Sequence, residues 1–498
     1  MCFAFLHIQK YGKGMFCMKY DVAIIGGGVV GSLLARELSK YELNIVLLEK
    51  ESDVACGASR ANSGIVHGGF DPLPGTKKAY YNVRGTAMME GLAKELGVSY
   101  RKNGSLVLAF SEEEMEHVRA LYARGQENGV PGLSLLDGEE VRRLEPHVSP
   151  KVMGGLRCTS AGIICPYGLT IAAMGNAMDN GAHLLCDFCV DKIEQAADSF
   201  LIHAKDQTVK ATYLVNSAGL YADRIAAMVG DEGYHVIPKK GEYILLDKAE
   251  GGLCNHTLFQ VPSAAGKGVL VTPTADGNLL VGPTSVVIED RTCRDTTADG
   301  LDSIKKAAGK TMADIPYRQT ITSFTGIRAA LAGEDDFIIA TGKHAPHAIH
   351  LLGIDSPGLS SAPALAVAVV DRLMTAGLPL RAKRDFNGTR PSYHAFKNAS
   401  EAEKNEKIKA DPRYGHMICR CEQITEGEIR EAVRRNPPAR TMDAVKRRVR
   451  AGMGRCQGGF CTTYIAELLA EENGTDVTAV TKSGAGSPLL CGKTREGD

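Results

Sequence analysis

The feature that most constrains this fold is a glycine-rich turn between a predicted strand and a predicted helix. Residues Val22–Ile25 form a short apolar run typical of a buried strand, and the pattern Gly26-x-Gly28-x-x-Gly31 follows it. An amphipathic stretch comes next, and then a second apolar strand that ends at Glu49. Strand, turn, helix and acid in this order predict a parallel α/β domain that binds a dinucleotide.

Each glycine of the turn has its own physical reason. Gly26 permits a tight turn, and Gly28 lets backbone amides approach a pyrophosphate. Gly31 lets the helix, expected to extend to Leu38, pack closely on the strand. The positive end of the helix dipole then faces the phosphates, and Glu49 is placed to meet ribose hydroxyls. NAD and FAD both satisfy this pattern, so the turn leaves the choice between them open.

A dense run of small residues follows the acid. It reads GASRANSGIVHGG over residues 57–69, where small side chains let the backbone lie against a flat ligand and Ser59 and Asn62 offer hydrogen bonds. With this run the chain resembles the glycerol-3-phosphate oxidase and dehydrogenase branch of the D-amino-acid-oxidase-like flavoproteins. The resemblance spans about residues 20–381 and includes SAG at 217–219, KGEY at 240–243, GVLVTPT at 268–274, FTGIR at 324–328 and GIDSPGL at 353–359.

The resemblance implies that the cofactor is FAD. The fold class it implies is α/β, with a discontinuous Rossmann-type FAD-binding domain and an inserted mixed-sheet substrate domain over residues 19–385. The residues that we expect around FAD are Gly26, Gly28, Gly31, Glu49, Ser59, Asn62, Ala218, Gly219, Gly353, Gly358, Leu359 and Ser360.

An apolar helix is expected after the last of these motifs. Ser360 and Ser361 can cap it, Pro363 suits its first turn, and Ala364–Leu373 forms its body. Its amino terminus would point at the flavin pyrimidine edge, where negative charge develops on reduction. The same residues also fit a well-capped core helix, and the two descriptions are compatible.

The resemblance also implies five residues around a substrate. His67 corresponds to the histidine beside the flavin, and Ser63 to a serine one helical turn earlier. Lys267, Arg328 and Ser356 correspond to residues of the substrate pocket. A histidine can take the proton of a secondary alcohol, and two cations can hold an anionic substrate. The plainer alternatives stay open: His67 as flavin packing, and Lys267 as a solvated loop lysine.

The composition changes towards the carboxyl end. Residues 386–413 are polar, charged and proline-bearing, which is typical of a linker, and residues 414–498 carry four spaced cysteines. These are Cys419-x-Cys421 and, after 34 intervening residues, Cys456-x4-Cys461. The predicted helices 426–434 and 442–451 lie between the two pairs.

Four cysteines can hold zinc, but zinc sites usually have the spacing CxxC twice. The spacing here resembles the bacterioferritin-associated-ferredoxin-like [2Fe–2S] domain that is appended to anaerobic glycerol-3-phosphate dehydrogenases. That resemblance implies a [2Fe–2S] cluster on the four cysteines. A basic group, Lys446, Arg447, Arg448, Arg450 and Arg455, precedes the third cysteine. It fits a solvated helix face, a docking site for an acidic partner, or a group that tunes the cluster potential.

The function expected from these motifs is FAD-dependent oxidation of sn-glycerol-3-phosphate to dihydroxyacetone phosphate, with electrons leaving through the cluster to a partner protein or a quinone-linked acceptor. The substrate would be a small anionic alcohol, and L-2-hydroxyglutarate or another 2-hydroxy acid satisfies the same chemistry. A different class also stays open, in which the chain is a non-catalytic flavin and iron–sulfur subunit for electron transfer.

Composition narrows the setting. The chain has 498 residues with 58 basic and 58 acidic side chains, and a balance of this kind argues against general nucleic-acid binding. The apolar runs are too short to span a membrane, so the cytoplasm is the expected location, with peripheral association at the inner face of the membrane through a partner as the alternative. Residues 1–18 are expected to be a disordered or mis-assigned extension.

Overall fold

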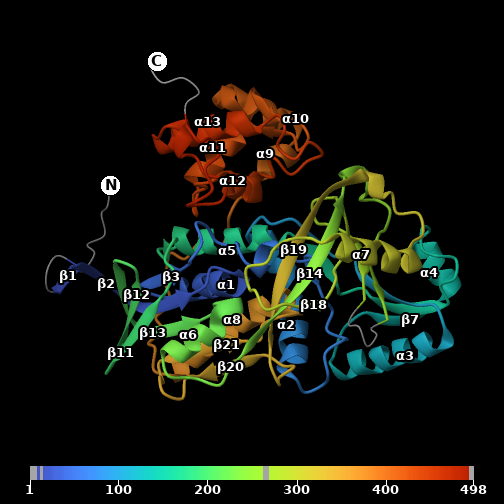
Figure 1. Cartoon of the computed structure of the whole chain (residues 1–498), viewed down its shortest axis with the longest axis horizontal. Helices are drawn as coiled ribbons and strands as arrows, with labels where there is room; N and C mark the ends of the chain where they lie inside the picture. The colour runs from blue at the N-terminus through green and yellow to red at the C-terminus, as the bar shows by residue number, and fades with distance from the viewer. Residues whose placement is uncertain (1–7, 12–14, 262–267, 493–498) are drawn as a thin grey trace.

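The computed structural model describes residues 8–11, 15–261 and 268–492, and three parts are seen in it (Figure 1). A nucleotide-binding sheet with its helices lies on one side, and a second sheet lies beside it. The orange and red C-terminal helices sit above both. In the described part of the chain, no helix combines the length and the apolar character needed to cross a bilayer.

The first sheet has a parallel core. In spatial order its parallel strands are β10 (His183–Leu185), β3 (Ile45–Leu48), β2 (Met15–Ile25), β13 (Gln207–Asn216) and β21 (Ala348–Leu352). Antiparallel strands extend it: β1 (Ile8–Tyr11), β11 (Lys192–Ala196), β12 (Ser199–Ala204) and β20 (Ile338–Thr341). Because the carboxyl ends of parallel strands meet at one edge, the loops after β2, β13 and β21 share that edge.

The central strands are buried on both faces, which explains their continuous apolar sequence. Val22 and Ile24 of β2 pack into the core formed with four helices: α1 (Val29–Leu38), α2 (Lys77–Glu95), α5 (Pro166–Asp179) and α8 (Gly358–Thr375). Ala23 and Ile25 point to the other face, where α6 (Ala222–Met228) and the long β12 and β13 close a second core. The predicted helix and strand around the glycine turn are therefore confirmed.

The second sheet is mixed. Its strands are β6 (Ser105–Ala109), β7 (Leu133–Asp137), β8 (Gly154–Cys158), β14 (Val236–Leu246), β15 (Thr257–Gln260), β16 (Leu270–Pro273), β17 (Leu279–Gly282), β18 (Val286–Val287) and β19 (Thr320–Leu331). Neighbours run antiparallel apart from β15 and β6. It carries α3 (Glu112–Glu127), α4 (Gly138–Leu144) and α7 (Ala298–Thr311). A small sheet of β4 (Ile65–Val66), β5 (Tyr100–Arg101) and β9 (Gly162–Ile164) links the two large ones.

The C-terminal unit is a small helical domain with its own apolar core. It contains β22 (Met417–Cys419), β23 (Ile424–Thr425), α11 (Glu426–Arg434), α12 (Met442–Val449) and α13 (Thr462–Asn473). Ile429, Val445 and Leu469 from the three helices meet in that core. Figure 1 shows the unit above the α5 edge of the first sheet.

Two segments differ in detail from their expected form. The stretch 386–413, expected to be a linker, contains α9 (Ala395–Asn398) and α10 (Glu401–Ala410). A capping box between Ser400 and Glu403 starts α10, which has no buried residue and so reads as polar from sequence alone. At the amino end, β1 and the first residues of β2 fall within the expected extension. The domain boundaries and the start codon stay predictions.

The apolar helix near the carboxyl end of the FAD domain begins earlier than expected. α8 starts at Gly358, so Pro363 lies inside the helix and not in its first turn. The Ser361 hydroxyl donates back to the carbonyl of Pro357 at 3.1 Å, which also accepts from the backbone N–H of Ser361. The expected capping by Ser360 and Ser361 is therefore wrong, because both lie within the first helical turns and point inward.

The packing at the glycine turn gives a stability prediction. A Cβ added at Gly31 would lie 2.1 Å from the carbonyl oxygen of Gly26, so we expect Gly31→Ala to destabilise the domain by about 1–3 kcal/mol. Gly91→Ala in α2 is the matched control, because its Cβ would meet no atom within 4 Å and should stabilise by about 0.4–1 kcal/mol. Thermal unfolding followed by circular dichroism compares the two, and equal midpoints would contradict the close packing.

Candidate functional site

A cavity of about 1260 Å³ lies at the shared edge of the first sheet, between that sheet and strands β14 and β19. Its volume exceeds the usual range for a pocket that binds one small ligand, and it suits a dinucleotide together with a substrate. Thirteen of the residues expected at the site line it: Gly26, Gly28, Glu49, Ser59, Asn62, Ser63, His67, Ala218, Gly219, Arg328, Ser356, Gly358 and Leu359. The sequence motifs therefore converge on one cavity.

The glycine turn leaves no space for side chains. Gly26 has a φ of +108°, and a Cβ there would lie 2.5 Å from the carbonyl oxygen of Ser217. The Glu49 carboxylate accepts a hydrogen bond of 2.7 Å from the backbone N–H of Gly27, which fixes it at the turn. Burial raises the pKa of Glu49, and backbone hydrogen bonds from Glu51 and Gly27 oppose that change. This cradle fits the ribose and pyrophosphate of a dinucleotide.

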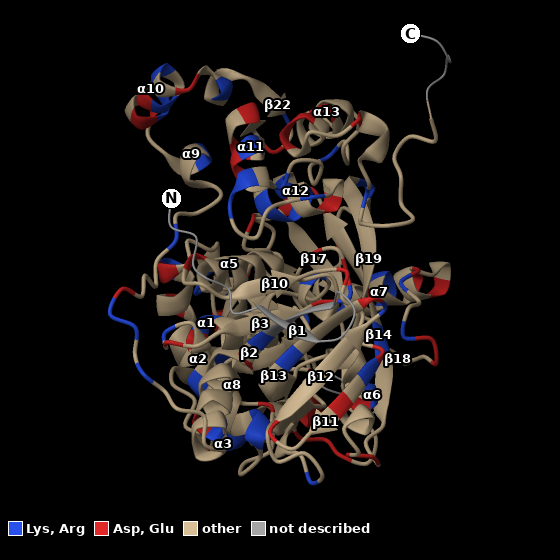
Figure 2. Ribbon diagram, turned by 90° about the vertical axis from the view of Figure 1, so that its left-hand side faces the viewer, with Lys and Arg blue, Asp and Glu red and all other residues tan. Residues whose placement is uncertain are grey.

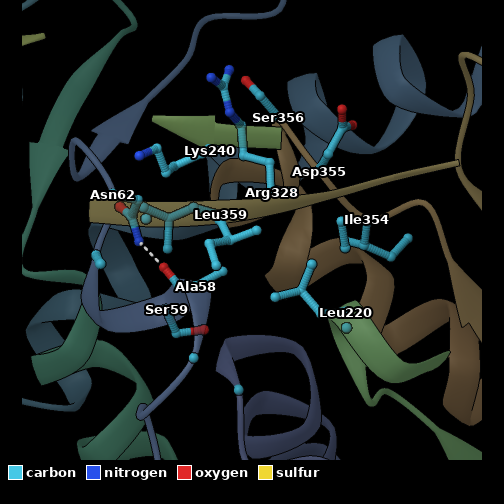
Figure 3. A pocket seen from close by; sticks show the side chains of 18 of the residues that line it. Ala58, Ser59, Asn62, Leu220, Lys240, Arg328, Ile354, Asp355, Ser356 and Leu359 are labelled. Carbon is cyan, nitrogen blue, oxygen red and sulfur yellow. Dashed lines mark hydrogen bonds between the residues drawn. The ribbon is translucent and has the colours of Figure 1, made fainter. Parts of the chain in front are cut away.

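The small-residue run is held by its own hydrogen bonds. The hydroxyl of Ser59 accepts from the backbone N–H of Val29 at 2.9 Å, at the first turn of α1. Asn62 donates to the carbonyl of Ala58 at 2.9 Å and accepts from the N–H of Gly64 at 2.8 Å (Figure 3). Ser59 and Asn62 therefore shape the cavity wall, and both side chains still line it.

Three expected cofactor residues are placed differently. Gly31 packs against the glycine turn. Gly353 has a φ of +66° and lies next to Leu331. Among the described residues that line the cavity, neither these glycines nor Ser360 appears. Ser360 is buried, and its hydroxyl accepts a 2.8 Å hydrogen bond from the backbone N–H of His67. Ser360 thus fixes the backbone at His67, which directly follows strand β4.

His67 is held from three directions. Its carbonyl oxygen accepts from Asn82 at 2.5 Å and from Thr86 at 2.6 Å, and both donors come from α2. Its imidazole stacks on the ring of Phe259 with centroids 5.7 Å apart. The backbone of His67 is thus fixed at both its N–H and its carbonyl, and the residue lines the cavity.

A cationic group faces the same cavity from the second sheet. Arg328 lies on β19, and its guanidinium donates to the carbonyl of Thr284 at 3.0 Å. Figure 3 shows Arg328 beside Ser356, with Asp355 on the same side. Lys267, the second expected cation, lies outside the described residues.

Tyr243 belongs to the motif at residues 240–243, and the motif alone does not indicate its place in the site. It pairs with Phe324 across β14 and β19, and the two rings stack at 4.8 Å. Burial raises the pKa of Tyr243, while Arg328 and a hydrogen bond with Ser63 act in the opposite direction. Strand alternation was the available signal, because Tyr243 and the paired Gly241 and Gly326 share one face.

Lys240 and Glu242 lie on the other face of β14 from Tyr243. Their buried side chains form an ion pair of 2.9 Å, and Glu242 also accepts from the N–H of Thr297 at 2.8 Å. They hold the start of α7 against β14, which is a structural task at the edge of the cavity.

The four cysteines of the C-terminal unit form two pairs. The sulfurs of Cys421 and Cys456 lie 3.6 Å apart, and a hydrogen bond joins Cys419 with Cys461. The hydrogen bond between them lowers the pKa of Cys419 and raises the pKa of Cys461, because the two sulfurs share one proton. Among the described residues, no group of three or more His, Cys, Asp or Glu side chains is placed for a single metal ion. The two pairs supply four thiol ligands, the number that a [2Fe–2S] cluster requires.

The basic group before Cys456 belongs largely to an interface within the molecule. Arg447 and Arg448 are buried and bind the carboxylate of Asp53, at 2.7 Å and 2.8 Å, in the loop after Glu49. Figure 2 shows basic residues of α11 and α12 where the C-terminal unit meets the rest of the chain. For these two arginines, the expectations of a solvated face and of a partner site are wrong.

Arg450 is the most connected residue of this interface. It ends α12 and binds Asp276 at 2.8 Å, Tyr167 at 3.0 Å and Asn278 at 3.1 Å. It also binds Glu422, the neighbour of Cys421, at 3.0 Å. The guanidinium of Arg450 therefore connects the loop of Cys421 with both larger domains. Its partners are far apart in the sequence, so the sequence alone does not predict these contacts.

The fold, the glycine cradle and the paired cysteines together define a flavoprotein with an appended iron–sulfur module. The family model described as FAD dependent oxidoreductase matches residues 21–372, and the BFD-like [2Fe-2S] binding domain matches residues 417–471. The chain belongs to the family of FAD-dependent oxidoreductases, and its cofactors are FAD and a [2Fe–2S] cluster.

Several proteins are similar to the chain. A glycerol 3-phosphate dehydrogenase of Caloramator mitchellensis is 47% identical over 476 residues, which cover 96% of this chain and 99% of that protein. The dithionite-reduced L-alpha-glycerophosphate oxidase of Mycoplasma pneumoniae with FAD bound is 32% identical, with a TM-score of 0.71, covering 75% of this chain and 98% of that one. An L-2-hydroxyglutarate dehydrogenase of Escherichia coli K12 is 27% identical, covering 75% and 100% of the two chains.

The Asp53 contact gives a prediction about the domain interface. Asp53→Asn leaves two buried arginines without their carboxylate, and we expect a loss of about 3–5 kcal/mol. Asp247→Asn is the control, because its partner Arg455 is exposed, and it should cost less than about 1 kcal/mol. Thermal unfolding and limited proteolysis of the C-terminal unit measure both. Similar losses in the two variants would contradict the interface.

The same contact sets a pH dependence. Burial would raise the pKa of Asp53, but Arg448 and Arg447 outweigh burial and hold it below its ordinary value. The contribution to stability is therefore fully present above the unfolded pKa of about 3.9 and is lost as the pH falls through the lower folded value. Proteolytic release of the C-terminal unit should rise only in that acidic range.

Proposed function

We propose that the chain is a dehydrogenase that oxidises sn-glycerol-3-phosphate to dihydroxyacetone phosphate, with the cluster module as the outlet for electrons. The observation that carries this proposal is that His67 and Arg328 line the same cavity, which fits FAD. The similarity over almost the whole length of a glycerol 3-phosphate dehydrogenase supports it. The same similarity includes the cysteine module, which the shorter oxidase relative does not span.

The cavity residues divide the chemistry between binding and proton transfer. Arg328 offers a cation for the phosphate, with Ser356 beside it as a hydrogen-bond donor (Figure 3). Lys267 is proposed as a second cation for the same group. The hydroxyls of Ser63 and Tyr243, already joined to one another, border the space between the cation and the histidine.

His67 is proposed as the general base. Its clamped backbone limits the motion of the ring, so that it can take the proton from the secondary hydroxyl in a fixed geometry. Bound FAD supplies the hydride acceptor of the reaction. The residues proposed to hold it are those of the glycine cradle, with Glu49 at the ribose and the start of α8 at the ring.

The cysteine module favours a dehydrogenase over an oxidase. A [2Fe–2S] centre accepts electrons one at a time and so offers them a route other than oxygen. We propose that Cys419, Cys421, Cys456 and Cys461 are the ligands of that cluster and that a protein partner or a quinone-linked acceptor follows it.

The test of the substrate is anaerobic bleaching of the flavin at 450 nm. We expect rapid bleaching with sn-glycerol-3-phosphate and none with L-2-hydroxyglutarate at the same concentration. Bleaching by the hydroxy acid alone would overturn the proposed substrate. If neither compound bleached the flavin, the non-catalytic electron-transfer subunit would replace the proposal.

The same assay tests the base. His67→Gln should slow bleaching by about 10²–10⁴-fold, because the hydroxyl proton loses its acceptor. His183→Gln is the matched control, since that exposed histidine on β10 bonds Tyr20 away from the cavity. A His67→Gln variant that bleached as fast as the control would show that His67 only packs the flavin.

The metal gives an independent prediction. Anaerobically purified protein should contain two irons and two sulfides per chain. Cys461→Ser should lose the iron and the turnover with external acceptors, while flavin absorbance at 450 nm reports that the first domain is folded. Cys293→Ser, a half-buried cysteine outside the module, is the control. Zinc in place of iron would contradict the cluster assignment.

A further inference from the structure

Phe460 stands out among the apolar side chains. It is 83% exposed, the largest value among the large hydrophobic residues of the described chain, and it directly precedes the buried Cys461. A hydrophobic residue just before a helix N-cap usually packs on the fourth helical residue, here Ile465. Ile465 is buried without it. Phe460 therefore lies in solvent and does not cover Ile465.

The cysteine set is open on the same loops. Cys421 is exposed and Cys456 is half-buried, whereas Cys419 and Cys461 are buried. Phe460 belongs to the loop that connects Cys456 with Cys461, and the N–H of Gly459 closes that loop on the carbonyl of Cys456 at 3.0 Å. The exposed aromatic ring thus lies a few residues from the solvent side of the cluster ligands.

Other exposed side chains lie close in sequence to the cysteine ligands. Tyr464 is 52% exposed one turn into α13, and Met417 precedes the first ligand on β22. We call Met417, Arg420, Phe460 and Tyr464 the ligand-loop surface. An apolar centre with a charged margin is typical of a protein interface.

The charged side chains of the ligand loops differ in their exposure and in their ion pairs. Arg420, between the first two cysteines, is exposed and forms no ion pair with any described residue. Arg455, beside Cys456, is exposed and contacts Asp247. The acid of these loops, Glu422, is turned inward and neutralised by Lys248 at 2.6 Å and Arg450 at 3.0 Å. Among the charged side chains of these loops, Arg420 is therefore the exposed charge that has no ion pair with a described residue.

We propose that the ligand-loop surface is the docking site of a small acidic protein that carries single electrons. The contacts of Arg447 and Arg448 with Asp53 bury that part of α12 against the flavin domain, and Arg450 holds the loop of Cys421 against Asp276, so the exposed residues of the ligand loops are what a partner can reach. One electron leaves the reduced cluster and enters the carrier, with no bond or proton transferred, and two such transfers follow each substrate. The inference rests on the proposed function, because it requires the cluster.

The test uses the full-length holoprotein, reduced with dithionite so that no substrate is needed. Two oxidised haem proteins serve as probes: the acidic haem domain of cytochrome b5 and the basic cytochrome c. We expect the acidic probe to be reduced faster at low salt, with a rate that falls roughly tenfold as screening increases. Isothermal titration calorimetry should show the same preference in binding, independently of turnover.

Two variants locate the contact. Phe460→Ser should weaken binding and slow electron transfer to the acidic probe by roughly tenfold, as expected for an aromatic anchor. Arg420→Glu, at an exposed position, should slow the transfer and flatten its salt dependence. The controls are Met374→Ser and Arg143→Glu, both exposed on the larger domains. The visible spectrum of the cluster must be unchanged in all four variants.

The outcomes separate cleanly. Faster reduction of the basic probe, or equal rates in Phe460→Ser and Met374→Ser, would overturn the docking site. Binding to quinone-containing lipid vesicles through Phe460, with neither haem protein bound, would assign the surface to a membrane instead and also overturn it. Because dithionite replaces the substrate, these failures are distinct from a failure of glycerol-3-phosphate to bleach the flavin.

Discussion

The contact on which the rest of the site depends is the close approach of three backbone segments at Gly26. The carbonyl of Gly26 faces Gly31 of α1, and the hydroxyl of Ser217 donates to the same carbonyl at 3.3 Å and to that of Ile25 at 3.0 Å. Segments almost 200 residues apart are thereby fixed at one point. Because both strands end there, the loops that follow them face one cavity, and a side chain at either glycine would separate them.

A second constraint joins that cavity to the cysteine module. Glu49 faces the cavity, and Asp53, four residues later, receives the two buried arginines of α12. Buried charges of this kind cost desolvation, and they fix a relative orientation more than they add stability. The interface therefore holds the cysteine unit in one position against the flavin domain. Arg450 fixes the loop that carries Cys421 in the same way.

Local patterns predicted most of the fold, and distant partners account for the differences. The helix after the glycine turn ends at the expected residue and helix α11 has its expected bounds, because periodicity and caps act within a few residues. Ser360 was assigned to the cofactor because its neighbours are, whereas its hydroxyl meets the N–H of His67, 293 residues away. The basic run before Cys456 is uniform in sequence, and only the fold shows which arginines have a carboxylate.

The basic residues near the cysteines fall into two groups that differ in their exposure. Arginines on one side of the C-terminal unit are neutralised inside the molecule, so they hold the module in place and cannot attract a partner. Arg420 keeps its charge in solvent beside an exposed cysteine and near an exposed aromatic ring. An acidic partner would therefore meet Arg420 and Phe460 on the ligand-loop surface, and not the buried arginines of the basic run.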